Sequence, residues 1–457
     1  MTLGATAAVD PAWLDELSEF LAIPSISASP AHRDDVGRAV GWVADFVERL
    51  GGTATVQDGS AGLPLLVGEV PAARRPHGTT PTVMLYGHCD VQPVEPLDAW
   101  DSDPFSATVR DGWLYARGAA DDKGNFYLLL KALENLVRSG DLPVDVRVVC
   151  DGEEEVIGTS VVDFLTEDER GADACIIFDG PMPQRDVPAF KLGQRGLVFF
   201  HVTVQTGEHE LHSGMYGGAA LNAASVMSTI LAAAVAGAGT LQDGVRPPTQ
   251  PELEEWARLG SGADALQRKG ARPLDECAAD DFYPRVFATA AVDVHGISCG
   301  EAALQKTVIP VEAEANVSVR VAAGQDPEEL AEQLAGLLTG AAPEGTEVTL
   351  KQLAGSPGTV VPADTDAVRL ARAAFEHTLG TRPVLMRSGG TLPVVAALVD
   401  NGIPAVVTGF DVPEGNVHAP NERLLMKYLP LGIASAQETL LRFAELRSAT
   451  TDRKRGT

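Results

Sequence analysis

The sequence has few cysteines, and their spacing forms no disulfide or ligand framework. Five occur in 457 residues, without Cys-x-x-Cys spacing. An odd and sparse set favours reduced thiols over disulfides. Cys89, Cys150 and Cys175 lie in apolar, strand-like surroundings, so we expect them to be small core residues.

Basic residues are also scarce. Lys and Arg number 35 against 63 Asp and Glu, which gives a formal net charge of -28. Such a chain repels nucleic acid phosphates and anionic membranes, so neither is expected as a partner. The acidity suits solubility or divalent cations, but by itself it identifies no partner.

Long apolar runs, internal repeats and low-complexity tracts are missing as well. No stretch suggests a transmembrane helix, and the N-terminus lacks the basic and apolar regions of a signal peptide, so we expect a cytoplasmic protein. Apolar residues make up 45% of the chain, enough to bury a sizeable core. The length predicts two or three domains.

The first 190 residues alternate between helices and apolar strands. Helices are predicted over residues 11–22, 35–50, 125–138 and 160–165, and strands before His88 and over 113–118, 144–150 and 174–178. Alternation with apolar strands is typical of an α/β domain whose largely parallel mixed sheet is flanked by helices.

The pattern changes near Lys191. Strands are predicted over 197–204, 288–294, 312–321 and 348–353, with helices starting near 219 and 327 and a polar stretch over 239–284. After residue 355 the sequence again alternates between helices and apolar strands, as in the first 190 residues. We therefore predict a discontinuous catalytic domain (1–190 and 356–457) with an inserted α+β lid and dimerisation domain (191–355).

Histidine and acidic residues follow several of the early strands. His88 and Asp90 stand two residues apart after one strand, so their side chains point to the same side. Asp121–Asp122, Glu153–Glu155 and Asp179 follow later elements. Ligands bind at the carboxyl ends of the strands in such sheets, and clustered carboxylates repel one another unless a cation lies between them. This edge of the sheet is therefore predicted to bind metal.

The candidate ligands are two histidines and three carboxylates: His88, Asp121, Glu155, Asp179 and His418. This set suits two zinc-like ions that share a bridging carboxylate, and the same ligand types accept manganese or cobalt. Hydrolysis at such a site also needs a general base that is not a ligand, and one of the adjacent glutamates can serve.

Several motifs together resemble a known family. They are Gly-His-Cys-Asp-Val-Gln-Pro, Ala-Arg-Gly-Ala-Ala-Asp-Asp-Lys-Gly, the Glu-Glu pair, Leu-His-Ser-Gly-Met-Tyr-Gly-Gly, Lys-Thr-Val-Ile-Pro, Ser-Gly-Gly-Thr-Leu-Pro and His-Ala-Pro-Asn-Glu. The set is similar to that of the dinuclear-zinc peptidases that include aminoacylases, glutamate carboxypeptidases and dipeptidases. The nearest branch is that of carnosinase and the cytosolic nonspecific dipeptidase, and the motifs cover nearly the whole chain in order.

The resemblance implies a role for each candidate ligand. His88 and Asp179 would bind one metal ion, Glu155 and His418 the other, and Asp121 would bridge them. The peptide between Asp121 and the next residue would be cis, as in relatives. Each subunit would bind two divalent ions. Zinc is the expected metal, and manganese and cobalt are the alternatives.

The same resemblance implies roles for residues that are not ligands. Asp90 would orient His88, and Glu154 would be the base that activates the water. His212 in the inserted domain would stabilise the oxyanion in the partner subunit's active site, which makes a homodimer necessary. The substrate would be held by three further residues: Thr307, Arg320 and Thr391.

One departure from the family pattern affects the glutamates. Two residues, Val156 and Ile157, precede Gly158, where relatives have one. Counting forward from Gly152 makes Glu154 the base and Glu155 the ligand, and Glu153 stays an alternative.

The predicted activity is hydrolysis of dipeptides by attack of a metal-bridging water. The alternatives are deacylation of N-acyl amino acids and cleavage of a C-terminal glutamate, both within the family. A noncatalytic relative that binds peptide or metal is a remote alternative, because Glu154 is present. A dinuclear phosphodiesterase is disfavoured by the net charge and by the lack of an obvious basic cluster.

Overall fold

The computed structural model describes residues 9–74, 79–156, 158–390 and 392–446. The chain forms two compact units. The first contains the chain up to Leu192 with Val361–Met386 and the part from Ala397 onward, and the second contains Gly193–Val360 with Arg387–Ala396. Residues 387–396 thus group with the second unit, although the sequence analysis places them in the catalytic domain. The predicted domain boundaries stay a prediction.

A mixed sheet forms the centre of the first unit. In spatial order its strands are β1 (Thr53–Asp58), β2 (Pro64–Val70), β6 (Asp145–Asp151), β3 (Thr82–His88), β7 (Ala174–Ile177), β17 (Ala405–Val407) and β8 (Ala189–Gln194), and β16 (Val384–Ser388) also pairs with β8. The four strands β6, β3, β7 and β17 are parallel, whereas β1, β2 and β8 join antiparallel. The predicted α/β class is confirmed, with the parallel part confined to the centre.

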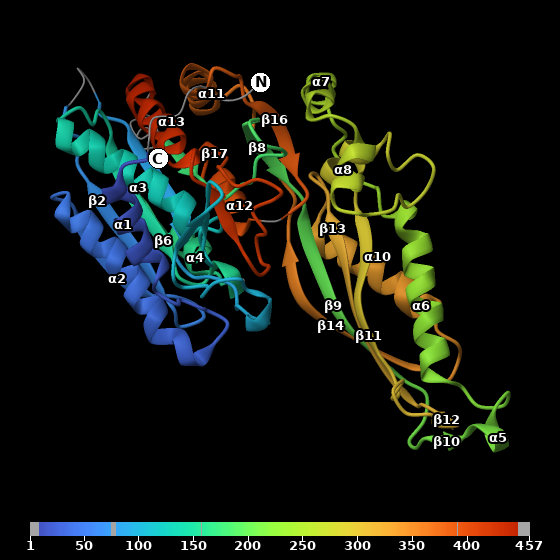
Figure 1. Ribbon diagram of the computed structural model, residues 1–457. Helices are drawn as coiled ribbons and strands as arrows, with labels where there is room; N and C mark the ends of the chain where they lie inside the picture. The colour runs from blue at the N-terminus through green and yellow to red at the C-terminus, as the bar shows by residue number, and fades with distance from the viewer. Residues whose placement is uncertain (1–8, 75–78, 157, 391, 447–457) are drawn as a thin grey trace. The chain divides into compact units, whose positions relative to one another are not determined.

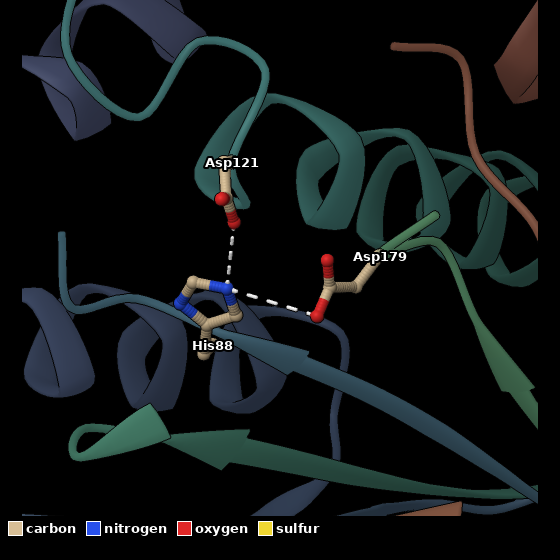
Figure 2. A group of neighbouring side chains, drawn as sticks. All are labelled: His88, Asp121 and Asp179. Carbon is tan, nitrogen blue, oxygen red and sulfur yellow. Dashed lines mark hydrogen bonds and ion pairs between the residues drawn. The ribbon is translucent and has the colours of Figure 1, made fainter. Parts of the chain in front are cut away.

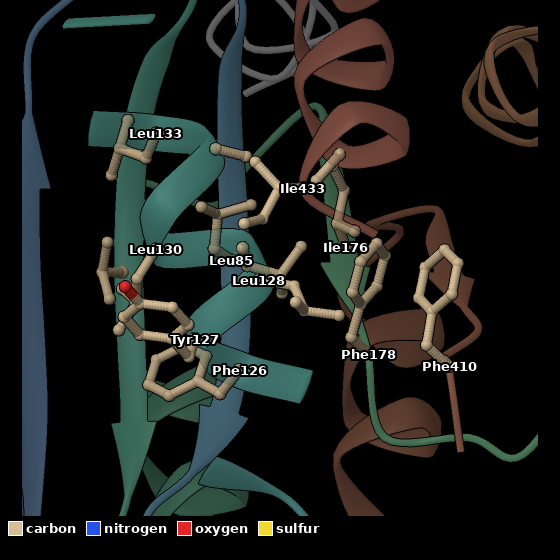
Figure 3. Close-up of a cluster of buried hydrophobic side chains, with 14 of the residues drawn as sticks. Leu85, Phe126, Tyr127, Leu128, Leu130, Leu133, Ile176, Phe178, Phe410 and Ile433 are labelled. Atoms are coloured by element: carbon tan, nitrogen blue, oxygen red, sulfur yellow. The ribbon is translucent and has the colours of Figure 1, made fainter. Parts of the chain in front are cut away.

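Helices cover this sheet and form the main core with it. They are α1 (Pro11–Leu21), α2 (Arg33–Arg49), α3 (Lys123–Ser139), α11 (Asp366–Leu379) and α13 (Tyr428–Arg442). Figure 3 shows Leu128 of α3 and Ile433 of α13 packed with Leu85 of β3 and Ile176 of β7. The apolar periodicity of the helices therefore accounts for their attachment to the sheet.

The parallel centre brings three strand ends to one edge. β3 ends at His88, β6 ends at Asp151, and β7 ends two residues before Asp179. The N-terminus of α3 approaches the same edge closely, since a Cβ at Gly87 would lie 2.3 Å from the Phe126 ring. Glycine at this position lets the helix start beside the end of β3.

Smaller elements complete the first unit. A three-stranded sheet has the order β18 (Arg423–Leu425), β5 (Trp113–Tyr115) and β4 (Thr108–Arg110). Helix α4 (Ser160–Glu167) follows β6, and α12 (Pro393–Asp400) runs from the second unit into the first. The pairing of β18 with β5 connects two distant parts of the chain that both carry predicted site residues.

The second unit is built on a four-stranded antiparallel sheet. Its strands, in order, are β11 (Ala291–Ser298), β13 (Glu312–Val321), β9 (Gly196–Gln205) and β14 (Glu347–Ser356). Helices α6 (Ala223–Gly237) and α10 (Pro327–Gly340) pack on it and bury Met227, Ile230 and Leu334. This agrees with the predicted α+β character of the insertion.

Shorter elements complete the second unit. At one end of the long strands lie β10 (Leu211–His212), β12 (Val308–Ile309) and α5 (Ser213–Tyr216) (Figure 1). The polar stretch after α6 contains α7 (Gln250–Trp256), α8 (Gly262–Arg268) and α9 (Phe282–Ala288), and β15 (Thr359–Val360) pairs with the Gly193–Gln194 end of β8. Among the described residues, Ala223–Thr240 is long and apolar enough to cross a membrane. This is weak evidence of a membrane span, because a helix that packs in a core, as α6 does, passes the same test.

Candidate metal centre

The fold brings all five predicted metal ligands together in the first unit. They form two groups: His88, Asp121 and Asp179, and Asp121, Glu155 and His418. Within each group the candidate ligand atoms lie within 4.8 Å of one another. Asp121 belongs to both groups, which is the arrangement that a bridging carboxylate requires.

His88 and Asp121 stand at the middle of the cluster. Figure 2 shows the His88 ring at the end of its strand, facing Asp121 and Asp179. Its Nε2 lies 3.0 Å from Asp121 Oδ1 and 3.9 Å from Asp179 Oδ2. In the other group, His418 Nε2 lies 2.9 Å from Asp121 Oδ2 and 3.2 Å from Glu155 Oε2. Each histidine thus contacts a different oxygen of the same carboxylate.

Asp90 lies on the far side of the His88 ring. Nδ1 of His88 is 3.1 Å from the Asp90 backbone oxygen and 3.4 Å from Asp90 Oδ1. An acceptor on Nδ1 leaves Nε2 as the nitrogen that faces the other carboxylates. Both residues are fully buried, so the ring has little freedom to turn.

Asp121 is held at the N-terminal end of α3. The Asp121–Asp122 peptide is cis, as the family resemblance implied. The neighbouring Asp122 is fully buried and accepts a hydrogen bond from His88 N at 3.3 Å. The side chain of Asp122 therefore connects this turn directly to the backbone of β3.

Glu155 is oriented from two sides. Its backbone N–H donates to Asp90 Oδ2 at 3.1 Å, and Gln92 Nε2 donates to its Oε2 at 2.8 Å. Its other oxygen, Oε1, is buried and has no hydrogen-bond partner among the described residues. A buried carboxylate oxygen without a donor is costly in free energy unless a cation binds it, so the site fits a metal ion.

Glu153 is occupied elsewhere. Its carboxylate accepts hydrogen bonds from Ser60 Oγ at 2.5 Å, Ala61 N at 2.9 Å and Ser160 N at 3.0 Å, and also from Ser160 Oγ. It joins two loops and lies in neither ligand group. This geometry favours the register in which Glu154 and Glu155 belong to the site.

Charges in the cluster perturb one another strongly. Burial alone would lower the pKa of His88, but its hydrogen bonds to Asp121 and Asp90 hold that pKa well above its usual range. Hydrogen bonds to Asp121 and Glu155 raise the pKa of His418 to about 10. Burial raises the pKa of Glu154 well above its usual range; His88 opposes this shift, and Asp179 and Glu155 add to it. Protons on the histidines thus balance the acidic residues when no cation is bound.

The remaining predicted site residues belong to the second unit. His212 on β10 pairs with Val308, and Ser213 N donates to the Thr307 oxygen at 3.0 Å, so His212 and Thr307 are neighbours. Arg320 lies near the other end of the adjoining strand β13. It stands eight positions after Glu312 at the strand's start, which corresponds to about 26 Å of extended chain.

Two residues complete the comparison of the site with the sequence-based prediction. Thr391 lies outside the described residues. Glu422, which the sequence reading did not select, accepts hydrogen bonds from the turn that carries Asp121. It stands in the His-Ala-Pro-Asn-Glu motif, which was the only signal that could have indicated it.

Comparison with known proteins agrees with this geometry. Residues 84–442 match peptidase family M20/M25/M40. The chain belongs to this family. The predicted family and the predicted class of metallopeptidase are therefore confirmed, and membership implies that the chain binds divalent metal ions.

Individual relatives cover nearly the whole chain. A cysteinylglycine-S-conjugate dipeptidase from Corynebacterium striatum is 28% identical over 89% of this chain and 90% of its own length. The human Beta-Ala-His dipeptidase is 27% identical over 90% of this chain and 86% of its own. The metallo-carboxypeptidase Sso-CP2 from Sulfolobus solfataricus has a similar structure, with a TM-score of 0.83, 26% identity and coverage of 95% and 100%. The predicted carnosinase-like branch agrees with these names.

Metal binding by the metal-free enzyme is expected to release protons near pH 7. The pKa values of His88 and His418 are raised, so both imidazoles are protonated near pH 7 in the metal-free protein. Only a neutral imidazole binds a metal ion, so each must lose its proton. Calorimetric titration with zinc in buffers of different ionisation enthalpy measures the number released, and affinity should fall as the pH is lowered. His418→Ala, as a comparison, should release fewer protons. Zinc binding without net proton release in the wild type would contradict this reading.

Proposed function

We propose that this chain is a dinuclear metallodipeptidase. The observation that carries the proposal is the shared position of Asp121, whose two oxygens face His88 and His418 separately. Asp179 completes one ligand group and Glu155 the other. Two zinc ions per subunit suit these nitrogen and oxygen donors best, with manganese or cobalt as alternatives.

The chemistry divides between bound metal and the chain's own residues. Divalent ions held by His88, Asp121, Glu155, Asp179 and His418 would polarise a substrate carbonyl and lower the pKa of a water molecule. Glu154 accepts the proton of the attacking water and delivers it to the nitrogen of the leaving amine as the C–N bond breaks. Its burial and its acidic neighbours, which raise its pKa, support this role. Asp90 holds His88 in place.

His212 supplies the oxyanion contact. Its Nδ1 accepts a hydrogen bond from Gly214 N at 3.1 Å, so the ring proton sits on Nε2 and is available as a donor. A preorganised donor of this kind stabilises the negative charge that develops on the carbonyl oxygen.

Two subunits are needed to complete the substrate site. We assign the substrate carboxylate to Thr307 and Arg320, and further backbone and hydroxyl contacts with the substrate to Thr391. Within one chain Thr307 precedes the start of β13 and Arg320 lies near the end of that strand, so the two are too far apart to hold the same carboxylate. A homodimer solves this problem, because a partner can bring His212 and Thr307 to a site whose Arg320 is its own.

Dipeptides are the proposed substrates, in a cytoplasmic setting without nucleic acid or membrane partners. The names of two relatives describe action on cysteinylglycine conjugates and on β-Ala-His. The five free cysteines and the charge of -28 are compatible with this setting.

A substrate panel separates dipeptidase activity from the alternatives. We expect kcat/KM for Cys-Gly or β-Ala-His to exceed that for N-acetyl or N-succinyl amino acids and for peptides with a C-terminal glutamate. Each compound is assayed with the same zinc-loaded sample. Faster turnover of the acyl amino acids would show that the enzyme is a deacylase and contradict the proposed dipeptidase activity. Inactivity on the whole panel would favour a noncatalytic relative.

Glu154→Gln is expected to lower kcat on the preferred dipeptide by about 10²–10⁴-fold, because the amide cannot accept the proton. Its zinc content should equal that of the wild type. The matched control is Glu153→Gln, whose carboxylate faces Ser60 and Ser160. That variant should lose thermal stability yet keep its kcat. The reverse outcome, with Glu153→Gln inactive and Glu154→Gln active, would contradict the assignment of Glu154 as the base.

Mixed dimers test whether His212 acts in the partner subunit. His212→Ala and Glu154→Gln should each be nearly inactive alone. After unfolding and reassembly of an equal mixture, half of the dimers combine the two variants and have one intact site, so about a quarter of wild-type activity should return. If the mixture is no more active than its parents, His212 acts within its own chain or not at all.

A further inference from the structure

Glu422 is a buried carboxylate outside the ligand set, and every hydrogen-bond donor around it comes from the site's framework. Its side chain is fully buried. Oε2 accepts from Arg117 Nη1 at 2.7 Å and from Gly118 N at 3.1 Å. Oε1 accepts from Ala120 N at 2.8 Å and from Asp121 N at 3.0 Å. One carboxylate thus organises the whole turn from residue 117 to 121.

The same residue ends the loop that carries His418. Its backbone oxygen accepts from Ala116 N at 3.2 Å, and the next residue, Arg423, pairs with Tyr115 in the small sheet. His418 lies four residues earlier in this loop. Glu422 therefore connects the two segments that supply Asp121 and His418, although about three hundred residues separate them in the chain.

The His418 loop adopts a conformation that needs such support. Asn416, His418 and Asn421 have φ values of 56°, 60° and 60°, in the left-handed region that residues with side chains rarely adopt. On its outer side Asn421 Oδ1 accepts from Asp101 N at 2.9 Å and Nδ2 donates to the Ala99 oxygen at 3.0 Å. These contacts hold one side of the loop, and Glu422 holds the other.

Arg117 extends the connection to a third segment. It is 2% exposed, and its Nη2 donates to the Pro93 oxygen at 2.9 Å. Pro93 follows Gln92, which orients Glu155. The Arg117–Glu422 pair therefore joins the turn of Asp121, the loop of His418 and the segment that positions Glu155.

We propose that Glu422 is the positioning residue that sets Asp121 against His418, so that one carboxylate can serve both ligand groups. This inference rests on the proposed metal centre. It differs from a general role in stability, because all four donors to the carboxylate lie within the turn that ends at Asp121, and three of them are backbone N–H groups.

The chain offers a matched control for a purely structural ion pair. Asp168 and Arg147 form a bidentate pair at 2.5 and 3.0 Å, with side chains only 8% and 4% exposed. This pair belongs to neither ligand group. Comparing Glu422→Gln with Asp168→Asn therefore separates the loss of a buried charge from the displacement of Asp121.

The first test uses the metal-free protein. A glutamine has the shape of Glu422 but provides one acceptor oxygen in place of two, and its amide group faces a donor. In Glu422→Gln we expect hydrogen exchange at the amides of Gly118, Ala120 and Asp121 to accelerate at least about tenfold. Asp168→Asn should leave these amides unchanged. Unchanged exchange in Glu422→Gln would overturn the proposal.

The second test measures metal affinity directly. Groups that orient metal ligands typically contribute about 10–100-fold to affinity, so Glu422→Gln should bind Zn²⁺ or Co²⁺ more weakly by that factor. Its Co²⁺ absorption spectrum should also change, while Asp168→Asn keeps the wild-type affinity and spectrum. Wild-type affinity in Glu422→Gln contradicts the inference. If the wild-type protein itself binds no metal, the proposed metal centre fails, and the exchange test still decides whether Glu422 positions Asp121.

A second variant covers the case in which Glu422→Gln does not fold. Arg117→Met combined with Glu422→Gln removes both buried charges, so no unpaired guanidinium is left behind. We expect this double variant to fold and still to bind metal about 10–100-fold more weakly. A folded double variant with wild-type affinity would show that Glu422 has no positioning role.

Discussion

Repulsion among buried carboxylates is the constraint on which the rest of this structure depends. Asp121, Glu155 and Asp179 converge at one edge of the sheet, with Glu154 beside them. Each would be easier to accommodate alone, since like charges in a buried site disfavour ionisation. Only cations make the arrangement favourable: protons on His88 and His418 in the metal-free protein, and divalent ions in the working enzyme.

The framework around this edge restricts how the ligands can move. Gly87 admits the start of α3, and the ammonium of Lys123 donates to the Phe20 and Ile23 oxygens at 3.2 and 2.6 Å at the end of α1. Between them, Glu422 accepts hydrogen bonds from the turn that carries Asp121. Helices, strands and loops from distant parts of the chain thus converge on Asp121, which explains why the two ligand groups share this one residue.

Most residues of the candidate site could be predicted from the sequence because the signals for them are local. A strand followed by His88 or Asp179 can be recognised from a few residues, and parallel strands bring such ends to the same edge. Motif order then indicated the family and the cis peptide after Asp121. The helices α1, α2 and α3 could be predicted because their apolar stripes and end signals are strong.

Other features depend on tertiary contacts that no local pattern reveals. Strand β1 is polar and largely exposed, so only its pairing with β2 defines it. Helices α7, α8 and α9 are short and lie in a polar stretch. The role of Glu422 depends on contacts with Gly118 and Asp121 across some three hundred residues.

The most direct test of the central claim is a zinc titration of the metal-free enzyme and of Asp121→Asn, with bound zinc and dipeptide hydrolysis measured on the same samples. A bridging Asp121 predicts two zinc ions bound per wild-type subunit, full activity only after the second, and weakened binding of both ions in the variant. If the wild type is fully active with one ion per subunit, or if Asp121→Asn weakens the binding of only one ion, Asp121 does not bridge the two groups.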